Sequence, residues 1–412
     1  MKNYNSMVGL SPELRAVLAG LGDSGLPPIR GKWFVVDPYK TTSPEGGVEG
    51  AYADLQTAYA QCVTNAGDGI LVLGSNADST AANTSYQKSP LVWSKNGITV
   101  VGACAPTRTY QRARIANKIV TKTATTISYT GDHTISDSAG GFLTAGFEAG
   151  QYLAITNAST NTNDFAVVAE GGSADFIRID SVTASTITTT STSAHVTTES
   201  AATAGQVVLT SYNWQVMKVT GSNNSFYNLH IVQGDNTAYA LDALYVSGAR
   251  NYFQNVHAAT GLASAATVLT RSLALIAAEE NTFVNCTFGN DTVDRGNNAT
   301  YDVYLYGAVK RNFFFGCQTI RYASAGTACG AVMLDTTEYG QPTTFDDCRF
   351  TCNNVTQMAK AILMNGANGK HWLTGGTSFP GYAAQGGALV VYNTGPTSST
   401  AGVSGVGTTP AS

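Results

Sequence analysis

The stretch Asn281-Thr-Phe283-Val-Asn285-Cys286-Thr287-Phe288 decides the fold, because similar stretches lie on both sides of it in the sequence. Five copies start at Asn224, Asn251, Asn281, Asn312 and Thr343, and the spacings between them are 27, 30, 31 and 31 residues. A weaker sixth copy, Lys370-His371-Trp372, starts 27 residues after the fifth. Repeats of this length are typical of solenoids, in which each repeat forms one coil and stacks on its neighbours.

Two positions of the repeat predict how each coil is built. The third residue of each copy is aromatic, and we expect these rings to form one internal column. The column consists of Phe226, Phe253, Phe283, Phe314, Phe345 and, in the sixth copy, Trp372. Two residues after each ring come Asn228, Asn255, Asn285, Gly316 and Asp347. Asn, Gly and Asp tolerate a positive φ, which a sharp turn between two sheets requires.

The residues that follow this turn alternate between apolar and polar. The apolar position holds Leu229, Val256, Cys286, Cys317 and Cys348, and the polar position holds His230, His257, Thr287, Gln318 and Arg349. Alternation with a period of two is typical of a strand with one buried face. We therefore predict a right-handed parallel β-helix over residues 209–395, in which the polar position faces outward.

Residues 31–121 are expected to form the start of the same rod. A predicted strand ends at Asp37-Pro38, a helix is predicted over residues 51–65, and a Gly67-Asp68 turn then precedes a buried strand. This order resembles the start of the pectate-lyase-like β-helix superfamily, in which a capping helix precedes the first full coil. The resemblance covers residues 31–105 and, through the repeat, residues 212–395.

Residues 122–208 interrupt the repeat. They are rich in Thr and Ser and contain short runs with strand-like alternation, such as residues 152–155 and 176–179. Closely spaced short strands favour a small antiparallel barrel. The stretch 141–155 resembles a small β-barrel that is common in bacteriophage virion proteins. We therefore predict an inserted β-barrel that projects sideways from the rod.

The two ends of the chain lack the repeat. Residues 1–30 are predicted to form a short helical attachment arm, and residues 396–412 form a tail rich in Gly, Ser and Thr. Ser11-Pro12 is a favourable helix start, because Ser caps the helix and Pro suits its first turn. The apolar stripe of this helix consists of Leu14, Val17, Leu18 and Leu21. Since an exposed apolar stripe usually marks a contact site, we expect it to attach the chain to a larger particle.

Composition narrows the classes of function. Charged residues make up 12% of the chain, the net charge is −4 and no basic cluster occurs, so binding to nucleic acid is not expected. No run of about 18 apolar residues occurs, so no membrane span is expected. The chain has seven cysteines, no CxxC pair and no signal-peptide pattern, which favours reduced thiols and synthesis in a host cytoplasm.

Pairs of carboxylates are the candidates for catalysis, because enzymes that cleave glycosidic bonds use two of them. The pairs are Glu279-Glu280, Asp291 with Asp294, Asp335 with Glu338, and Asp346-Asp347. They fall in predicted turns and loops, where structural or solvated roles are the better interpretation. If the chain has a catalytic pair, Asp291 and Asp294 are the candidates for it.

The histidines of the repeat are candidate metal ligands, and its column of cysteines could bring adjacent coils within disulfide distance. His230 and His257 occupy the same position on adjacent coils, but Thr287 follows them where a third ligand is needed. A surface ladder is the better interpretation, and we expect neither a metal nor a cofactor. The cysteines of the apolar position are interpreted as small fillers of the core.

The first hypothesis is a non-enzymatic structural protein of a bacteriophage particle, either a capsid decoration (cement) subunit or a spike subunit, on the virion surface. Its expected partners are capsid or other virion proteins, host surface glycans, and further copies in a homotrimer, which the resemblance to phage β-helix spikes implies. The alternative is a tail-spike receptor-binding protein with polysaccharide depolymerase activity. Its aromatic surface could come from Tyr301, Tyr304, Tyr306, Tyr322 and Tyr339. A secreted adhesin is disfavoured by the missing signal-peptide pattern.

Overall fold

The structure is a computed structural model of the 412-residue chain. It describes residues 29–37, 51–74, 85–87, 91–104, 113–117, 120–131, 133–160, 177–190, 196, 198–201, 206–212, 215–233, 242–260, 270–294, 300–322, 330–336, 343–353, 358–364, 371–380 and 382–384. The predicted attachment residues Leu14, Val17, Leu18 and Leu21, the tail 396–412 and Tyr339 lie outside these ranges.

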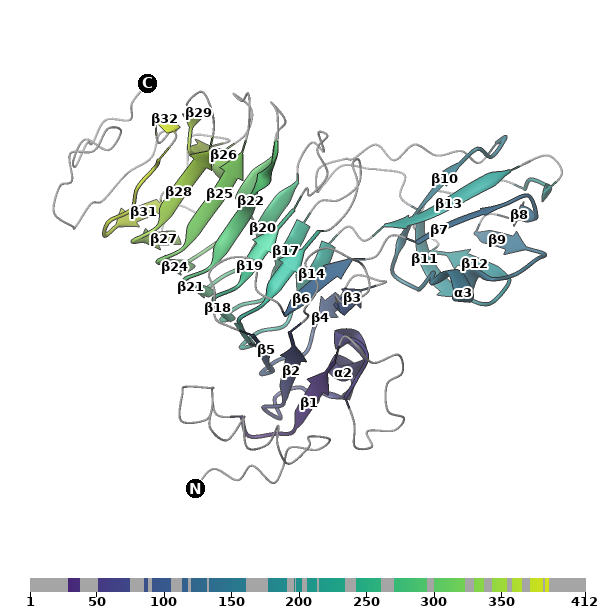
Figure 1. The fold of residues 1–412 in the computed structure, drawn as a ribbon, viewed down its shortest axis with the longest axis horizontal. Coiled ribbons are helices and arrows are strands. Elements are labelled where there is room, and N and C mark those ends of the chain that lie inside the picture. The colour runs from purple at the N-terminus through teal and green to yellow at the C-terminus, as the bar shows by residue number, and fades with distance from the viewer. Residues whose placement is uncertain are drawn as a thin grey trace.

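Three parallel sheets run along the rod, and each full coil contributes one strand to each sheet (Figure 1). Sheet A consists of β1 (Trp33–Val36), β2 (Gly69–Leu73), β5 (Thr99–Ala103), β15 (Ser225–Tyr227), β18 (Tyr252–Gln254), β21 (Thr282–Val284), β24 (Phe313–Phe315), β27 (Thr343–Asp346) and β31 (His371–Thr374). Sheet B consists of β3 (Ser85–Gln87), β6 (Arg114–Asn117), β16 (His230–Val232), β19 (His257–Ala259), β22 (Thr287–Asp294), β25 (Gln318–Tyr322) and β28 (Arg349–Asn353). Sheet C consists of β4 (Leu91–Trp93), β14 (Gln215–Val219), β17 (Asp242–Val246), β20 (Arg271–Ile276), β23 (Tyr301–Gly307), β26 (Gly330–Thr336) and β30 (Ile362–Met364).

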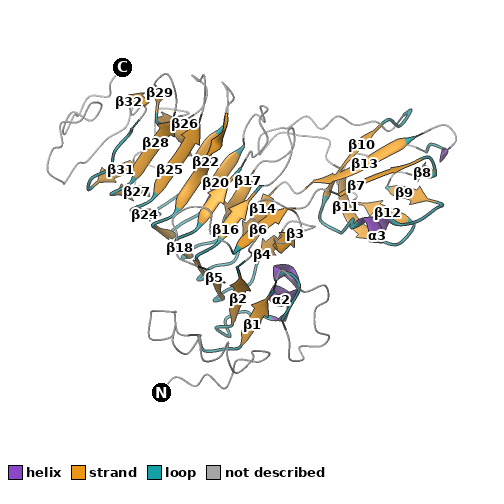
Figure 2. Ribbon diagram, in the orientation of Figure 1, coloured by secondary structure: helices purple, strands orange, loops and turns teal. Residues whose placement is uncertain are grey.

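The chain winds from sheet C to sheet A to sheet B and then returns to sheet C on the next coil, for example through β14, β15, β16 and β17. The fold is a right-handed parallel β-helix, so the prediction from the repeat is confirmed. Nearly all of the described chain is strand or loop (Figure 2). A further pair of strands, β29 (Met358–Lys360) and β32 (Tyr382–Ala384), lies near the C-terminal end of the rod.

A short helix, α2 (Leu55–Gln61), packs on the first strands of the rod. It is shorter than the predicted helix over residues 51–65, because Asp54 caps its first turn and extended backbone follows at Cys62. The Asp54 carboxylate accepts a hydrogen bond from the backbone N–H of Thr57 at 2.7 Å. Leu55, Tyr59 and Cys62 are buried in the same core as the coils, so the helix completes the core at this end.

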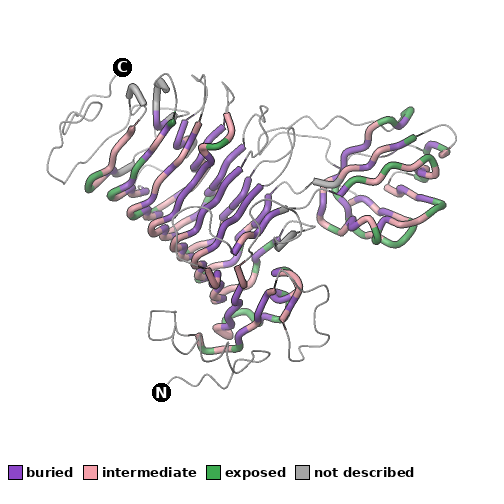
Figure 3. Tube along the Cα trace, viewed as in Figure 1, coloured by how far each residue is buried: buried purple, intermediate pink, exposed green. Residues whose placement is uncertain are grey.

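The phenylalanine column lies inside the rod, where buried residues line every coil (Figure 3). The five rings of Phe226, Phe253, Phe283, Phe314 and Phe345 stack with centroids 4.8, 4.7, 4.6 and 4.7 Å apart. The assignment of Trp372 to this column is wrong. Leu373 pairs with Phe345, and Trp372 pairs with Thr344 on the neighbouring strand. The sixth copy is therefore offset by one residue, which exchanges the inward and outward positions of a strand.

Two ladders of polar residues run parallel to this column. Each residue of the turn position has a positive φ, between 51° and 60°, at Asn228, Asn255, Asn285, Gly316 and Asp347. The second ladder was not expected from the sequence, and it is made by the first residue of each of the first four copies. Asn224, Asn251, Asn281 and Asn312 are buried, and Nδ2 of each of the first three donates to the Oδ1 of the next at 3.0–3.1 Å. Nδ2 of Asn312 donates to the carbonyl oxygens of Ala278 and Lys310. The same Oδ1 atoms accept backbone N–H groups, so both ends of each amide are paired along the rod.

The inserted unit is a seven-stranded antiparallel sheet beside the rod (Figure 1). Its strands, in sheet order, are β7 (Val120–Ala124), β13 (Val207–Tyr212), β10 (Tyr152–Thr156), β11 (Ile177–Val182), β12 (Thr186–Thr189), β9 (Thr134–Asp137) and β8 (Ile127–Thr130). Only residues 125 and 126 separate β7 from β8, although these strands are opposite ends of the sheet, so the sheet curls around its own core. A short helix, α3 (Phe142–Ala145), buries Phe142 in that core.

Deleting residues 118–214 and joining Asn117 to Gln215 through a short Gly-Ser linker is expected to leave the thermal transition of the rod in place. The inserted sheet has a core of its own, and β6 and β14 lie close to each other on the rod. Circular dichroism during heating measures the transition. The control deletes residues 225–321, which is the same number of residues taken from the coils of the rod, and should fail to fold. Loss of the transition in the first deletion contradicts an independent inserted unit.

Candidate functional site

The face of sheet C that points away from the core carries a row of side chains that includes two tyrosines and a lysine. In register along the rod, this row consists of Val92, Lys218, Tyr245, Ala274 and Tyr304. The Lys218 ammonium lies 4.8 Å from the centre of the Tyr245 ring. The Arg271 guanidinium lies 4.7 Å from the Tyr304 ring, which also stacks with Tyr301 and Tyr306 at 5.9 and 6.0 Å. Three of the five tyrosines singled out in the sequence therefore lie together here.

Asp242 lies beside this row but cannot reach a substrate. Its side chain is 0% exposed, and its two oxygens accept hydrogen bonds from Nε and Nη2 of Arg271 at 2.6 and 3.0 Å. Burial raises the pKa of the Asp242 carboxyl, and the bidentate Arg271 guanidinium opposes that rise and favours the ionised form. The carboxylate is therefore a structural partner of Arg271 and is not placed to act as a nucleophile.

A second buried ion pair lies between sheets B and C. Arg321 of β25 and Asp302 of β23 are 1% and 2% exposed at the side chain. Nε and Nη2 of the guanidinium each donate to one carboxylate oxygen at 3.1 Å, and Nη1 donates to the Thr300 hydroxyl at 2.9 Å. No sequence pattern predicts this ion pair, because Arg321 and Asp302 do not occupy equivalent positions of the repeat. Its geometry fixes the corner at which one coil leads into the next.

The carboxylate pairs proposed from the sequence are dispersed over the rod. Glu279 and Glu280 lie in a turn and pair with Arg250 and Arg311 of the neighbouring coils. Asp291 and Asp294 are both in β22, and the Asn353 amide lies 3.3 Å from an Asp291 oxygen. Asp347 holds its turn position, and the Asp346 carboxylate lies against Gly375 of the next coil. For Asp335 and Glu338 the side chains fall outside the described part.

The histidine pair is buried, so the expectation of a surface ladder is wrong. His230 and His257 are 2% and 0% exposed, and their rings stack 4.5 Å apart at 6°. The Arg114 Nε lies 3.3 Å from Nδ1 of His230, and the Nε2 of His257 lies 2.9 Å from the carbonyl oxygen of Gly289. The side chains face away from the phenylalanine column, but neighbouring coils cover them. Among the described residues, no group of three or more His, Cys, Asp and Glu side chains is placed to hold a metal ion.

The stability of the chain is expected to fall between pH 6.5 and pH 4 because of this pair. Burial lowers the pKa of His257 from 6.5 to about 4 and that of His230 well below 6.5. The unfolded chain therefore binds a proton below pH 6.5 that the folded chain does not bind. The loss for His257 alone should approach about 3 kcal/mol at pH 4.

Urea unfolding at pH 7 and pH 5 measures this effect. His257→Gln, whose amide can still donate to Gly289, is expected to lose less stability than the wild type between these two values. His133→Gln in the inserted sheet is the matched control for the loss of an imidazole outside this pair. An identical pH dependence in wild type and His257→Gln would show that the pair does not titrate on unfolding.

The cysteine column is a set of reduced thiols in the core. The Sγ atoms of Cys286, Cys317 and Cys348 lie 3.4–3.5 Å from carbonyl oxygens of Phe253, Phe283 and Phe314 on preceding coils. All three cysteines are free and buried, and burial raises the pKa of the Cys317 thiol. All three side chains are therefore packing groups of the core, and burial favours the neutral form of the Cys317 thiol.

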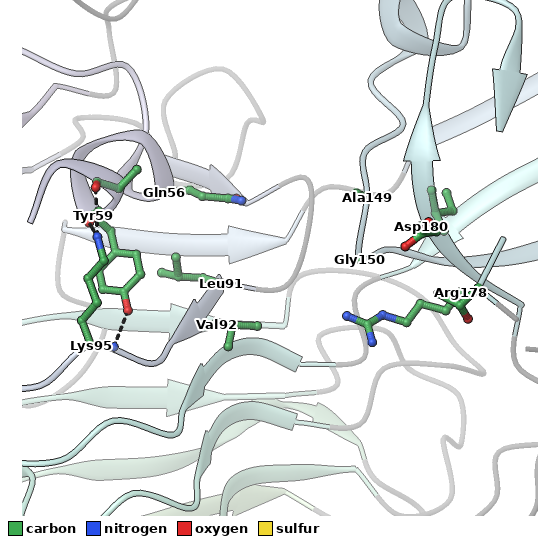
Figure 4. Close-up of a pocket in the computed structure, with 12 residues that line it drawn as sticks. Gln56, Tyr59, Leu91, Val92, Lys95, Ala149, Gly150, Arg178 and Asp180 are labelled. Carbon is green, nitrogen blue, oxygen red and sulfur yellow. Dashed lines mark hydrogen bonds between the residues drawn. The ribbon is translucent and has the colours of Figure 1, made fainter. Parts of the chain in front are cut away.

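A cleft of about 590 Å³ lies between the start of the rod and the inserted sheet (Figure 4). The rod contributes Gln56, Tyr59, Ala60, Leu91, Val92 and Lys95, and the inserted unit contributes Ala149, Gly150, Arg178, Ile179, Asp180 and Thr190. The Lys95 ammonium donates to the carbonyl oxygens of Tyr59, Ala60 and Cys62 at 2.7–2.9 Å and so caps α2. No sequence pattern indicates this cleft, because its two walls are far apart along the chain.

Comparison with known proteins finds solved structures of low sequence identity and low structural similarity. No protein-family model and no curated protein matches the chain. Pectin methylesterase PemA from Erwinia chrysanthemi is 13% identical with a TM-score of 0.40, over 87% of this chain and 80% of that chain. Pectin methylesterase from Aspergillus niger is 10% identical with a TM-score of 0.41, over 86% of each chain. The tailspike of Acinetobacter baumannii bacteriophage AP22, solved with a capsular saccharide, is 11% identical with a TM-score of 0.19, over 83% and 69%. These similarities are confined to the β-helix fold.

No helix in the described part of the chain is both long enough and apolar enough to cross a bilayer.

Proposed function

We propose that the chain is a non-enzymatic structural subunit of a bacteriophage particle, exposed as a capsid decoration or spike subunit. The observation that carries the proposal is that the buried polar side chains of the rod are paired with one another. The buried asparagines form a continuous ladder, and the buried charges of Asp242 and Asp302 are each paired with an arginine. Such pairing stiffens a rod along its axis and leaves these groups no capacity to bind or attack a substrate.

The attachment site of this proposal is the arm at residues 1–30, which is inferred from the sequence. Deleting residues 1–30 is expected to abolish incorporation into particles, because Leu14, Val17, Leu18 and Leu21 would supply the apolar contact. Quantitative mass spectrometry of purified particles measures occupancy. Deletion of the tail 396–412 is the control and should leave occupancy unchanged. Normal occupancy without residues 1–30 contradicts attachment through the arm.

The proposed oligomer is a homotrimer. Charged residues make up 12% of the chain, and depletion of charge is typical of surfaces that are covered by partners. Light scattering of the purified full chain tests the oligomeric state and should give the mass of three copies. A monomer at high protein concentration contradicts the trimer.

The alternative function is a tail-spike that binds and cleaves a surface polysaccharide. The stacked rings of Tyr301, Tyr304 and Tyr306 favour it, because aromatic faces on a rod suit contact with sugar rings. Incubating the full chain with capsular polysaccharide of the host and measuring new reducing ends tests for cleavage. We expect none. Cleavage that is lost in Asp291→Asn or Asp294→Asn, and kept in Asp180→Asn, would establish the alternative.

A further inference from the structure

The strands of sheet A carry almost no charge. Among the described residues of β1, β2, β5, β15, β18, β21 and β24, none is charged, and Asp346 of β27 is the first charged residue along the sheet. By contrast, the strands of sheet C include Lys218 and Arg271, and those of sheet B include Arg114 and Arg349. Charge is depleted at the centre of surfaces that a protein partner covers. The outer face of sheet A is therefore the side of the rod that is best suited to such a contact.

At the start of the rod, this outer face is buried by the chain itself. A separate apolar cluster faces away from the phenylalanine column and consists of Trp33, Val35, Leu71 and Val101. These four side chains are between 1% and 7% exposed. Ile29 and Ala51, from the segments before β1 and before α2, pack against them. Where the outer face of sheet A is covered, it therefore packs against apolar protein side chains.

The same face continues along the later coils with aromatic side chains that are exposed in part. Strand pairing extends the row of Val101 along the rod through Tyr227, Gln254, Val284 and Phe315. Phe315 is 43% exposed, and its ring lies parallel to that of Phe313 with the centres 6.4 Å apart. The Tyr252 ring of the neighbouring row lies 5.7 Å from that of Tyr227. An apolar surface that is buried on the first coils and exposed on the later ones marks a contact site.

The partner that fits this face best is a second copy of the chain. The coils repeat every 4.6–4.8 Å, as the ring spacings of the phenylalanine column show. A parallel copy of the rod has the same repeat, so the side chains of two copies can meet layer by layer along the whole face. The strands β18, β21, β24 and β27 follow one another along one edge of the rod, which gives the face its length (Figure 1).

Three-fold symmetry decides how the copies meet. A three-fold axis keeps all rods parallel, and a rod can meet both other copies through one set of residues only if that set lies at the axis. We propose that the outer face of sheet A lies at the axis of the homotrimer and packs against the same face of the two other copies. This assignment rests on the homotrimer proposed above. It places the Phe315 side chains of the three copies at the same height and close together.

Light scattering at equal protein concentrations tests the assignment. Phe315→Glu brings three carboxylates together at the axis and is expected to change the mass from three copies to one. Val92→Glu on sheet C is the matched control, because Val92 is also 43% exposed, and this variant should keep the mass of three copies. Circular dichroism during heating verifies that both variants fold.

The outcomes separate this assignment from the trimer itself. A folded Phe315→Glu variant with the mass of three copies overturns the assignment and leaves the trimer in place. A wild-type monomer overturns both. A wild-type monomer that is retained on a neutral polysaccharide column, when Phe315→Glu is not retained, assigns the face to a sugar instead.

A cysteine at the same position tests the contact without a new charge. Oxidation of Phe315→Cys with diamide is expected to link two of the three copies through a disulfide, because the axis brings their thiols together. The wild type, with its seven cysteines, and Val92→Cys are the controls and should give no linked dimer. Denaturing electrophoresis without reductant measures the linked product. A trimeric Phe315→Cys variant that gives no linked dimer, or equal linkage in Val92→Cys, overturns the position of this face at the axis.

Discussion

Replacing Phe283 with alanine is expected to lower the free energy of unfolding by about 3–5 kcal/mol. The ring is 0% exposed and stacks on Phe253 at 4.7 Å and on Phe314 at 4.6 Å. It also meets Phe288 of sheet B edge to face at 6.0 Å. The coils above and below cannot close the space that the ring leaves, because the pairing of their strands fixes their separation. The variant therefore loses both the burial of the ring and the contacts around the resulting cavity.

Phe315→Ala is the matched control. Phe315 directly follows Phe314 in the same strand but is 43% exposed, so its loss should cost about 0.5 kcal/mol or less. Urea unfolding followed by circular dichroism measures both variants. Similar losses for the two substitutions would mean that the column contributes no more to stability than the outer surface.

Replacing Arg321 with methionine is expected to cost a similar amount, about 3–5 kcal/mol, for an electrostatic reason. The substitution leaves the Asp302 carboxylate in the interior without the two hydrogen bonds that it accepts from the guanidinium at 3.1 Å. It also removes the hydrogen bond to Thr300. A buried carboxylate without its counter-ion is costly because the interior cannot solvate the charge.

The double variant Arg321→Met with Asp302→Leu separates this effect from a loss of packing. It removes both charges together and should recover most of the stability lost by Arg321→Met alone. Arg311→Met, which breaks an exposed ion pair with Glu280, is the control and should cost less than about 1 kcal/mol. If the double variant is no more stable than the single one, the unpaired charge is not the cause of the loss.

The positions that were predicted correctly share a physical basis. A solenoid places the same position of every coil in the same environment. The pattern of the repeat therefore predicts which residues face inward and which form the sharp turn. Phe283 and Asn285 could be placed because their neighbours in space are copies of themselves. The asparagine ladder of Asn251 and Asn281 has the same basis, because asparagine recurs at the first position of four copies of the repeat.

The features that were not predicted depend on contacts between unlike positions. Arg321 meets Asp302 across a corner, and no periodicity links the two residues. His257 is buried because Gly289 of the next coil approaches its ring, which alternation along one strand does not reveal. The cleft requires residues of the rod, such as Val92, to face residues of the insertion, such as Arg178. Trp372 lies outside the column because the strand register pairs Leu373, and not Trp372, with Phe345.

The central claim is that this β-helix is a structural part of a particle rather than an enzyme. Electron microscopy of intact particles that carry the chain tests it most directly. The account predicts rod-shaped density on the particle surface, with the inserted sheet to one side near the start of the rod and the N-terminal end of the chain at the particle. Particles that are complete and infectious without such density, while the chain remains free in the lysate, would contradict the claim.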